Sequence, residues 1–464
     1  MKDSNPSTRT LGPVPSILPW SIGAWIRDIQ ITGFAGLALL SLQIAEFGRF
    51  KPGLVHHAHE GLGSLLVFRV PFTLAAFILL IASLQFRKVR LRIFSGWFLL
   101  YAIYFLVSSI WSTAPVMTFG KGTELLIGLG IVLFVSCAED PLYRLDALRT
   151  LLLRAIATVG SVAVVGYLLR IPAFVSQRPG IFLTSNADTP FLSSNGLGYI
   201  SSLLLLCVIA DYLSGRNHGQ RVFMESGYAL FLFLFAASRT SLLIIVVGIG
   251  LLFIRKSRIL GASYFILIVV GIYLNLDRVI NVIQEHQSQR NFDTLSGRTV
   301  VWAAAWRQWE TNPFLGFGGG VGGKFVIAHL KISNLQVLSS LHNGFLETLT
   351  GLGAVGFIIV VSLLITITLS TCRRWCKQDD MLGSYIPIVH IWIVSIMSIG
   401  ALAWMSYEVM IYIILISVLD IQREYDRGRC ELSQWRRRWV RFWLALHRKT
   451  VLLAAKLSED VGHV

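Results

Sequence analysis

Long apolar runs, separated by short polar segments, occupy most of this chain. Runs of about 20 apolar residues are long enough to cross a bilayer as helices. Within lipid every backbone polar group must find a partner inside the protein, so only helices or a closed barrel can span it. Barrel strands alternate apolar and polar residues, whereas Ser241–Ile254 reads SLLIIVVGIGLLFI without alternation. The sequence therefore predicts an all-α integral membrane protein.

About twelve segments have the length and composition of a membrane-spanning helix. Of the 464 residues, 54% are hydrophobic and only 14% are charged, against about 25% charged in soluble proteins. The predicted spans are 30–48, 65–86, 93–112, 117–138, 151–170, 192–213, 222–238, 240–254, 259–276, 345–371, 383–402 and 404–420. They divide the chain into an N-terminal tail (1–29), a first set of helices (30–276), a long loop (277–344), a second set of helices (345–420) and a C-terminal tail (421–464).

The distribution of basic residues predicts the orientation of the chain. The net charge of +16 comes largely from Lys and Arg in short loops at helix ends and in the tail 421–464. This is the positive-inside pattern of membrane proteins and not a nucleic-acid-binding face. We expect both tails in the cytoplasm and the loops 171–191 and 277–344 on the opposite, periplasmic side. The tail segment QWRRRWVRFWLALHRK is typical of an amphipathic helix on anionic lipid, so membrane lipids are expected partners.

The remaining motifs do not indicate a metal or nucleotide site. Cys372 and Cys376 form a single CxxxC pair without a nearby His, and the predicted outside loops hold no DxD-like pair of carboxylates. The glycine run Gly316–Gly323 lacks the strand–loop–helix setting and the GK[ST] ending of a phosphate loop. We expect it to turn the backbone sharply or to approach a ligand closely. No metal and no cofactor is therefore expected.

The loop 277–344 is predicted to contain a helix of its own. In SGRTVVWAAAWRQWETNP, Ser296 can cap the start of a helix and Pro313 follows its end. Apolar and aromatic residues recur at three- and four-residue spacing on one stripe of this helix: Val301, Trp302, Ala305, Trp306 and Trp309. The stripe has two compatible interpretations, a helix that lies on the bilayer surface and a lid over a lipid-linked substrate.

Five residues on the expected outside surface could carry chemistry. Arg178 lies in the first outside loop and Arg239 in the tight turn between two spans. Arg298 lies at the start of the loop helix, Arg307 nine residues later on the same helix, and His342 where the long loop re-enters the membrane. A guanidinium group offers a planar, charged set of donors that matches phosphate oxygens. An imidazole accepts a proton near neutral pH. Together these residues predict a transfer in which a lipid diphosphate leaves while a hydroxyl activated by His342 attacks.

Each of these residue types also has a purely structural interpretation. An arginine at a helix end often marks topology or extends its side chain to the membrane surface, and we expect Arg69, Arg154 and Arg170 to be of that kind. A single histidine at a loop–helix junction is often a hydrogen-bonded cap. The chemical hypothesis for His342 and the arginines therefore depends on their meeting in one pocket.

The order of four motifs resembles the O-antigen ligase and polysaccharide polymerase superfamily. The motifs are RPGIF…SSNGLGY, ASRTSLL, SGRTVVWAAAWRQWETNPFLGFGGG and LHNGFLETLTGLGAVGF, which together cover about residues 175–365. The resemblance implies a glycosyltransferase C-type membrane fold in the inner membrane, with a large periplasmic loop and no metal or nucleotide sugar. It also implies undecaprenyl diphosphate-linked glycan as substrate, His342 as catalytic residue and Arg178 and Arg239 as diphosphate ligands. Arg298 matches a family arginine at the start of the loop helix, and we group it with them.

The acceptor is left open by the same motifs. A polymerase adds the glycan to the next lipid-linked repeat unit, and a ligase adds it to lipid A–core; HNGFLE and SRTSLL favour an exopolysaccharide polymerase. Other polysaccharide export proteins are further expected partners. A transporter of lipid-linked glycan and a structural subunit of an envelope assembly are alternatives of other classes. The absence of an internal repeat and the position of the unusual residues in outside loops favour the enzyme.

Overall fold

The computed structural model describes the greater part of the chain. The described residues are 22–47, 62–84, 91–136, 141–171, 175–176, 186–187, 194–215, 219–236, 238–275, 298–323, 326, 341–375, 389, 392–393, 396 and 419–421. All structural statements below refer to these residues.

The described chain is almost entirely helical, as predicted. Its helices are α1 (Ile22–Phe47), α2 (Leu62–Leu84), α3 (Ile93–Val107), the 3₁₀ turn η2 (Ser108–Ile110), α4 (Pro115–Ser136), α5 (Pro141–Leu168), α6 (Ser194–Leu213), α7 (Gln220–Ala236), α8 (Arg239–Lys256), α9 (Arg258–Leu274), α11 (Arg298–Thr311) and α13 (Gly344–Trp375). Two short strands, β1 (Val175–Ser176) and β2 (Asn186–Ala187), pair antiparallel.

Helices occur at each of the first ten predicted spans, from 30–48 to 345–371. Five helical stretches among the described residues are long and apolar enough to cross a membrane: Ile93–Ile110, Pro115–Ser136, Tyr143–Leu168, Gly196–Leu213 and Gly344–Cys372. The predicted spans 383–402 and 404–420 and the amphipathic tail lie, apart from a few residues, outside the described part. The architecture of a membrane-embedded helical bundle is thus supported, and the number of twelve spans stays a prediction.

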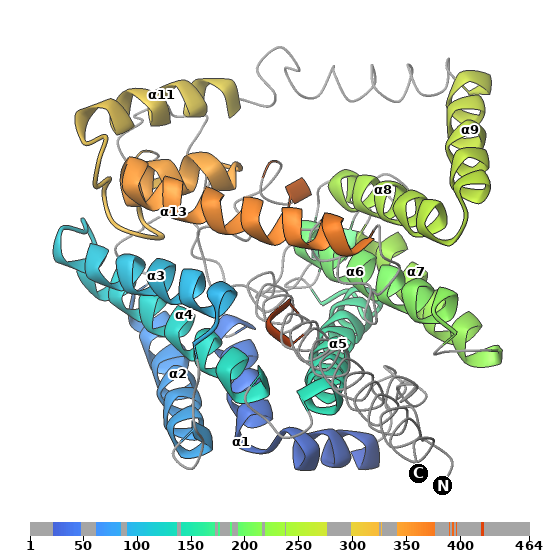
Figure 1. Ribbon diagram of the computed structural model, residues 1–464, viewed down its shortest axis with the longest axis horizontal. Helices are drawn as coiled ribbons and strands as arrows, with labels where there is room; N and C mark the ends of the chain where they lie inside the picture. Colours follow the sequence, from blue (N-terminus) through green and yellow to red (C-terminus); the bar gives the residue numbers. More distant parts are fainter. Residues whose placement is uncertain are drawn as a thin grey trace, which may run out of the picture.

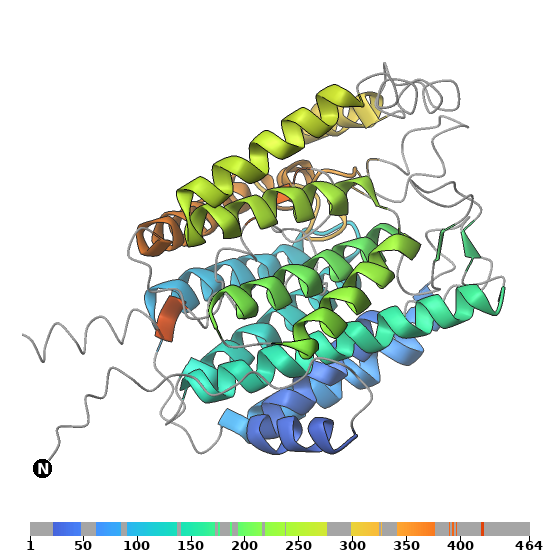
Figure 2. The same cartoon turned by 90° about the vertical axis from the view of Figure 1, so that its right-hand side faces the viewer.

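The helices pack as neighbours in an order that follows the chain only in part. Helix α1 packs on α2 and α5, α3 on α4 and α13, and α6 on α5, α7 and α8, while α9 packs on α8 (Figure 1). In Figure 2, α11 and the strands β1 and β2 lie toward the right-hand end of the bundle. This end, at which α4, α6, α8 and α13 begin, is called the His342 end below.

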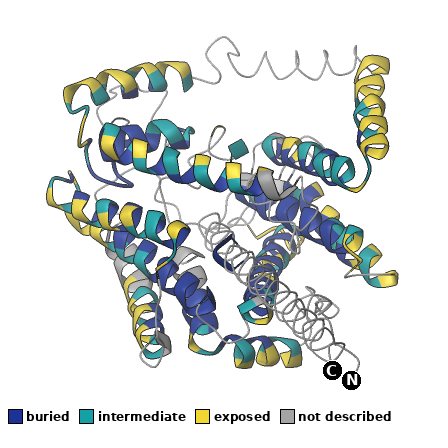
Figure 3. Ribbon diagram, viewed as in Figure 1, coloured by how far each residue is buried: buried dark blue, intermediate teal, exposed yellow. Residues whose placement is uncertain are grey.

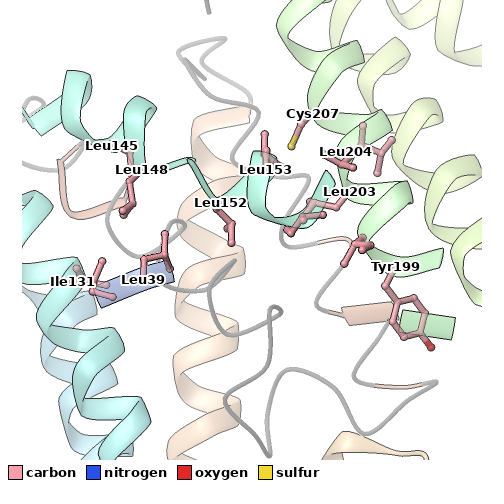
Figure 4. Packing of buried hydrophobic residues seen from close by; sticks show 14 of the residues in the cluster. Leu39, Ile131, Leu145, Leu148, Leu152, Leu153, Tyr199, Leu203, Leu204 and Cys207 are labelled. Atoms are coloured by element: carbon pink, nitrogen blue, oxygen red, sulfur yellow. The ribbon is translucent and has the colours of Figure 1, made fainter. Parts of the chain in front are cut away.

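The centre of the bundle is made by α4, α5 and α6. In Figure 4, Leu148 of α5 lies toward Leu39 of α1 and Ile131 of α4, and Leu152 of α5 lies between these residues and Leu203 of α6. Figure 3 shows these helices as mostly buried, whereas α9 and α11 are largely exposed. The exposed side chains of α9 are mostly large and apolar, as expected for a helix that faces hydrocarbon.

Two helices that the sequence predicts as continuous are broken at a glycine. Gly33 in α1 has φ 57° and ψ −141°, and Gly353 in α13 has φ 65° and ψ −170°. These dihedral angles are accessible to glycine and are strained for other residues. Each predicted span, 30–48 and 345–371, therefore consists of two helical pieces. Helix α1 also begins at Ile22, inside the predicted tail 1–29.

Arg154 does not extend to the membrane surface, contrary to our expectation. Its side chain is fully buried in the middle of α5 and its Nη1 donates to Oδ2 of Asp28 in α1, which is equally buried. Five residues earlier on α5, Arg149 Nη2 donates to Asp211 Oδ2 of α6 at 2.8 Å. Charges cannot be left unpaired in so apolar a setting, so the two ion pairs hold α1 and α6 to α5.

We predict that Arg154→Met will destabilise the protein strongly, because the carboxylate of Asp28 is then buried without its partner. The expected loss is about 3–5 kcal/mol, measured as a fall in melting temperature of the detergent-solubilised protein. The double variant Asp28→Asn/Arg154→Met should recover most of the loss, since neither charge remains.

Arg258→Met is the matched control for this experiment, because Arg258 is exposed at the start of α9. It should melt within a degree or two of the parent, on the order of the small effects of exposed charges. Equal melting temperatures for Arg154→Met and Arg258→Met would show that the buried pair contributes nothing to stability.

Candidate functional site

The backbone of Leu341, the residue before His342, is held by side chains from two different helices. Its N–H donates to Oε1 of Glu347 in the first turn of α13, at 2.8 Å. Its carbonyl oxygen accepts from Nε1 of Trp302 in α11, at 2.7 Å. The side chain of Leu341 is itself buried. The backbone N–H and the carbonyl oxygen of Leu341 are therefore both hydrogen-bonded within the protein.

His342 follows with a φ of 51°, in the left-handed region. Histidine enters this region more often than most residues do, but the conformation still costs on the order of 1–3 kcal/mol. Strain of this kind persists only where the surrounding structure imposes it, and it concentrates at functional sites. The His342 side chain is partly exposed, so the imidazole is accessible while its backbone is fixed.

Asn343 starts α13 and explains why the helix begins at this point. Its Oδ1 accepts from the N–H groups of Phe345 at 3.0 Å and Leu346 at 3.1 Å. This is the side-chain cap that the first turn of a helix requires. Asn343 therefore caps the first turn of α13, a role that the sequence also allows for His342.

Helix α11 packs on the His342 segment through part of its predicted apolar stripe. Val301 and Ala305 form a small buried cluster with Leu341 and Val326. The rest of the stripe points elsewhere: Trp306 is 48% exposed and lies 4.9 Å, ring centre to ring centre, from Trp309. One side of α11 therefore supports His342, and Trp306 is left to meet lipid, substrate or water.

Arg298 is the first residue of α11 and lies one turn before Trp302. Residues four apart lie on the same side of a helix. Arg298 therefore lies on the side of α11 from which Trp302 donates to Leu341. The side chain is partly buried. The structure thus brings Arg298 and His342 into one substructure, although a phosphate contact by Arg298 stays a prediction.

Arg239 and Arg178 are located less completely. Arg239 is the first residue of α8, directly after the buried Ser238. Arg178 lies outside the described residues, in the segment that joins β1 to β2. Strand β2 packs on α5, α6 and α7 and lies toward the His342 end in Figure 2. Whether the side chains of Arg178 and Arg239 meet His342 therefore remains the hypothesis drawn from the sequence.

The glycine run Gly316–Gly323 is hydrogen-bonded to other parts of the protein, through both backbone and side-chain groups. Phe317 N–H donates to Thr350 O at 2.9 Å, and Gly318 N–H donates to Gly351 O at 2.8 Å. Gly319 N–H donates to Ser108 Oγ at 3.0 Å, and its carbonyl accepts from Thr118 Oγ1 at 3.1 Å. Because these N–H groups are used within the protein, the run is a close-packed joint between α13 and the α3–α4 turn.

The break in α13 at Gly353 is closed by the residues before this joint. Ala354 N–H donates to Pro313 O at 2.8 Å and Val355 N–H donates to Phe314 O at 3.4 Å. The Leu352 carbonyl accepts from the Tyr104 hydroxyl at 3.1 Å. A Cβ on Gly353 would collide with the Phe314 carbonyl. The backbone groups released by the break are thus paired with the residues that follow α11 and with Tyr104 of α3.

Sequence reasoning missed the two residues that hold Leu341. An Asn before an apolar run is a recognisable cap signal, so the role of Asn343 could have been found. Glu347 carries no motif that would single it out, and Trp302 was predicted only as part of the apolar stripe. Their shared partner could not be found from periodicity, since Trp302 and Leu341 are 39 residues apart in the chain.

Comparison with known proteins identifies a domain around this site. The O-antigen ligase family model matches residues 226–361, a segment that starts in α7 and ends in α13 and that contains Arg239, Arg298 and His342. Arg178 lies upstream of it. No curated protein matches the chain. The O-antigen ligase domain at residues 226–361 supports the assignment of this chain to the O-antigen ligase and polysaccharide polymerase superfamily.

Proposed function

We propose that the protein transfers a glycan from undecaprenyl diphosphate to an acceptor hydroxyl at the His342 end, and that it polymerises exopolysaccharide or O-antigen repeat units. The observation that carries the proposal is the fixed, strained backbone of a partly exposed histidine inside an O-antigen ligase domain. A residue that served only to start α13 would not need this conformation, because Asn343 already provides the cap.

The proposed reaction is a displacement at the anomeric carbon of the lipid-linked sugar. His342 accepts the proton of the acceptor hydroxyl as the oxygen attacks. A new C–O bond forms, the bond from carbon to the diphosphate oxygen breaks, and the lipid diphosphate leaves with the electron pair. Arg178, Arg239 and Arg298 are proposed to stabilise the developing charge on that leaving group.

The position of the site relative to the membrane follows from the basic residues. We propose that the His342 end faces the periplasm of the bacterial inner membrane, because the short loops at the opposite end hold most of the Lys and Arg residues. The apolar helices would then place the lipid diphosphate at the membrane surface, within reach of loop 277–344.

Transport of lipid-linked glycan is the candidate function from another class. Broken helices often form the substrate sites of transporters, and both α1 and α13 are broken. The freed groups of α13, however, are bonded to residues 313–318 and to Tyr104. This break therefore anchors a loop, which favours the transferase over the transporter.

We predict that His342→Asn will abolish polymer formation. Asn tolerates a left-handed backbone but cannot act as the base, so the protein should be present in the membrane at normal level. Polymer on gels from cells and product from lipid-linked substrate in vitro are the two measurements. His329→Asn, in the same loop, is the matched control and should retain activity. Full-length polymer from His342→Asn would remove the base assignment.

We predict that Arg298→Lys will lower activity about 10- to 100-fold, the range expected for loss of a charged hydrogen bond. Lysine keeps the charge but cannot form the two-pronged contact with phosphate. Arg307→Lys is the control, because Arg307 lies on the same helix and is exposed. Arg178→Lys and Arg239→Lys should behave like Arg298→Lys. Equal activity of the Arg298 and Arg307 variants would argue against diphosphate binding by Arg298.

We predict that the purified protein in vesicles will lengthen lipid-linked repeat units without any other acceptor. In a second arm, lipid A–core is added and joined product is sought by mass spectrometry. A polymerase gives chains in the first arm and no lipid A–core conjugate in the second. A glycan–lipid A–core conjugate formed without chain growth would show that the protein is a ligase and not a polymerase.

A further inference from the structure

We infer that Trp302 and Glu347 are positioning residues that clamp Leu341 and thereby hold the imidazole of His342 in its working orientation. The inference rests on the proposed function, and it adds two residues to that site. Each contacts the peptide segment next to His342 from a different element. Together they make the loop helix α11 a part of the catalytic arrangement.

The contact from Glu347 is unusual for a carboxylate. Its side chain is only 3% exposed, and its Oε1 accepts from Leu341 N–H at 2.8 Å. The other oxygen, Oε2, lies so close to Gly323 that a Cβ there would collide with it. A buried carboxylate is costly unless it is well bonded, so its presence between Leu341 and the glycine run indicates a defined task. That task is to fix the turn in which His342 lies.

The contact from Trp302 links this turn to a distant part of the chain. Trp302 Nε1 donates to Leu341 O at 2.7 Å while Val301 and Ala305 of the same helix pack against the Leu341 side chain. Undocking of α11 would remove the donor and the apolar support together. His342 would then be free to leave the left-handed region, which it occupies at a cost.

The two contacts act on the orientation of the imidazole and not on substrate affinity. If one contact is lost, only a fraction of molecules keeps His342 in the competent conformation, and the rate falls by that fraction. We therefore expect kcat to fall about 10- to 100-fold while KM for the lipid-linked glycan changes little. A residue that binds substrate would raise KM instead.

The test compares four variants of the full chain in lipid nanodiscs. Trp302→Phe keeps an aromatic ring, though a smaller one, and removes the N–H donor. Trp309→Phe is its control, because it makes the same change on the same helix at a residue whose Nε1 donates to Pro313 O and not to Leu341. Glu347→Ala removes the acceptor, and Glu347→Gln keeps an acceptor oxygen without the charge. Trp302→Phe and Glu347→Ala should lose kcat, whereas Trp309→Phe and Glu347→Gln should stay within about threefold of the parent.

A second measurement does not depend on activity. Hydrogen–deuterium exchange of the peptide that contains Leu341 should be faster in Trp302→Phe and Glu347→Ala than in the parent and in the two other variants. Unchanged exchange in Trp302→Phe and Glu347→Ala would overturn the clamp. So would a loss of activity that lies wholly in KM, or a Glu347→Gln variant as inactive as Glu347→Ala.

The outcomes separate this inference from the proposed function. If His342→Asn keeps its activity, the base assignment fails, while the exchange experiment still decides whether Trp302 and Glu347 hold Leu341. If His342→Asn is inactive and both Trp302→Phe and Glu347→Ala behave like the parent, the function stands and the clamp fails.

Discussion

Backbone hydrogen bonds that a broken helix cannot make for itself determine how the His342 end is built. At Gly353 the chain leaves the helical conformation, and in a membrane-spanning segment the released N–H and carbonyl groups must be paired within the protein. Residues 313–318 supply most of these partners. The break in α13 and the loop that fills it therefore depend on each other, and the loop brings α11 with it.

This arrangement explains how a large loop can hold the proposed catalytic residue in place. Loops are mobile unless their backbone groups are bonded and their apolar side chains are buried. Here the glycine run bonds to α13 and to the α3–α4 turn, and α11 packs on Leu341. His342 lies between these two supports, at the point where the loop becomes helix α13.

Much of the fold could be predicted from the sequence, because apolar runs long enough to span lipid can only be helices. The helix α11 and its end before Pro313 were also predicted from local signals, namely the spacing of apolar residues and the residues that start and stop a helix. The breaks at Gly33 and Gly353 were not, since a glycine within an apolar run looks like an ordinary helix position. The burial of Arg154 was missed because its partner Asp28 lies in a segment assigned to the tail.

The candidate site was predicted in part for the same reasons. The position of His342 at the start of a helix could be predicted from local sequence. The helix that begins with Arg298 could be predicted from its apolar stripe. Their connection through Trp302 and Leu341 depends on tertiary packing between α11 and α13, for which residue spacing offers no signal. Sequence motifs indicated the superfamily that the family match at residues 226–361 supports, and the positions of Arg178 and Arg239 relative to the imidazole stay a prediction.

The break at Gly353 also has a mechanical consequence. Bilayers differ in thickness, and a spanning helix adapts to them by changing its tilt. In a continuous helix such a change would swing the first turn and everything attached to it. Because α13 is two pieces, and residues on both sides of Gly353 are bonded to residues 313–318, a lean of the long piece beyond this joint is not carried rigidly into Gly344–Leu352. The imidazole of His342 would thus keep its orientation in membranes of different composition.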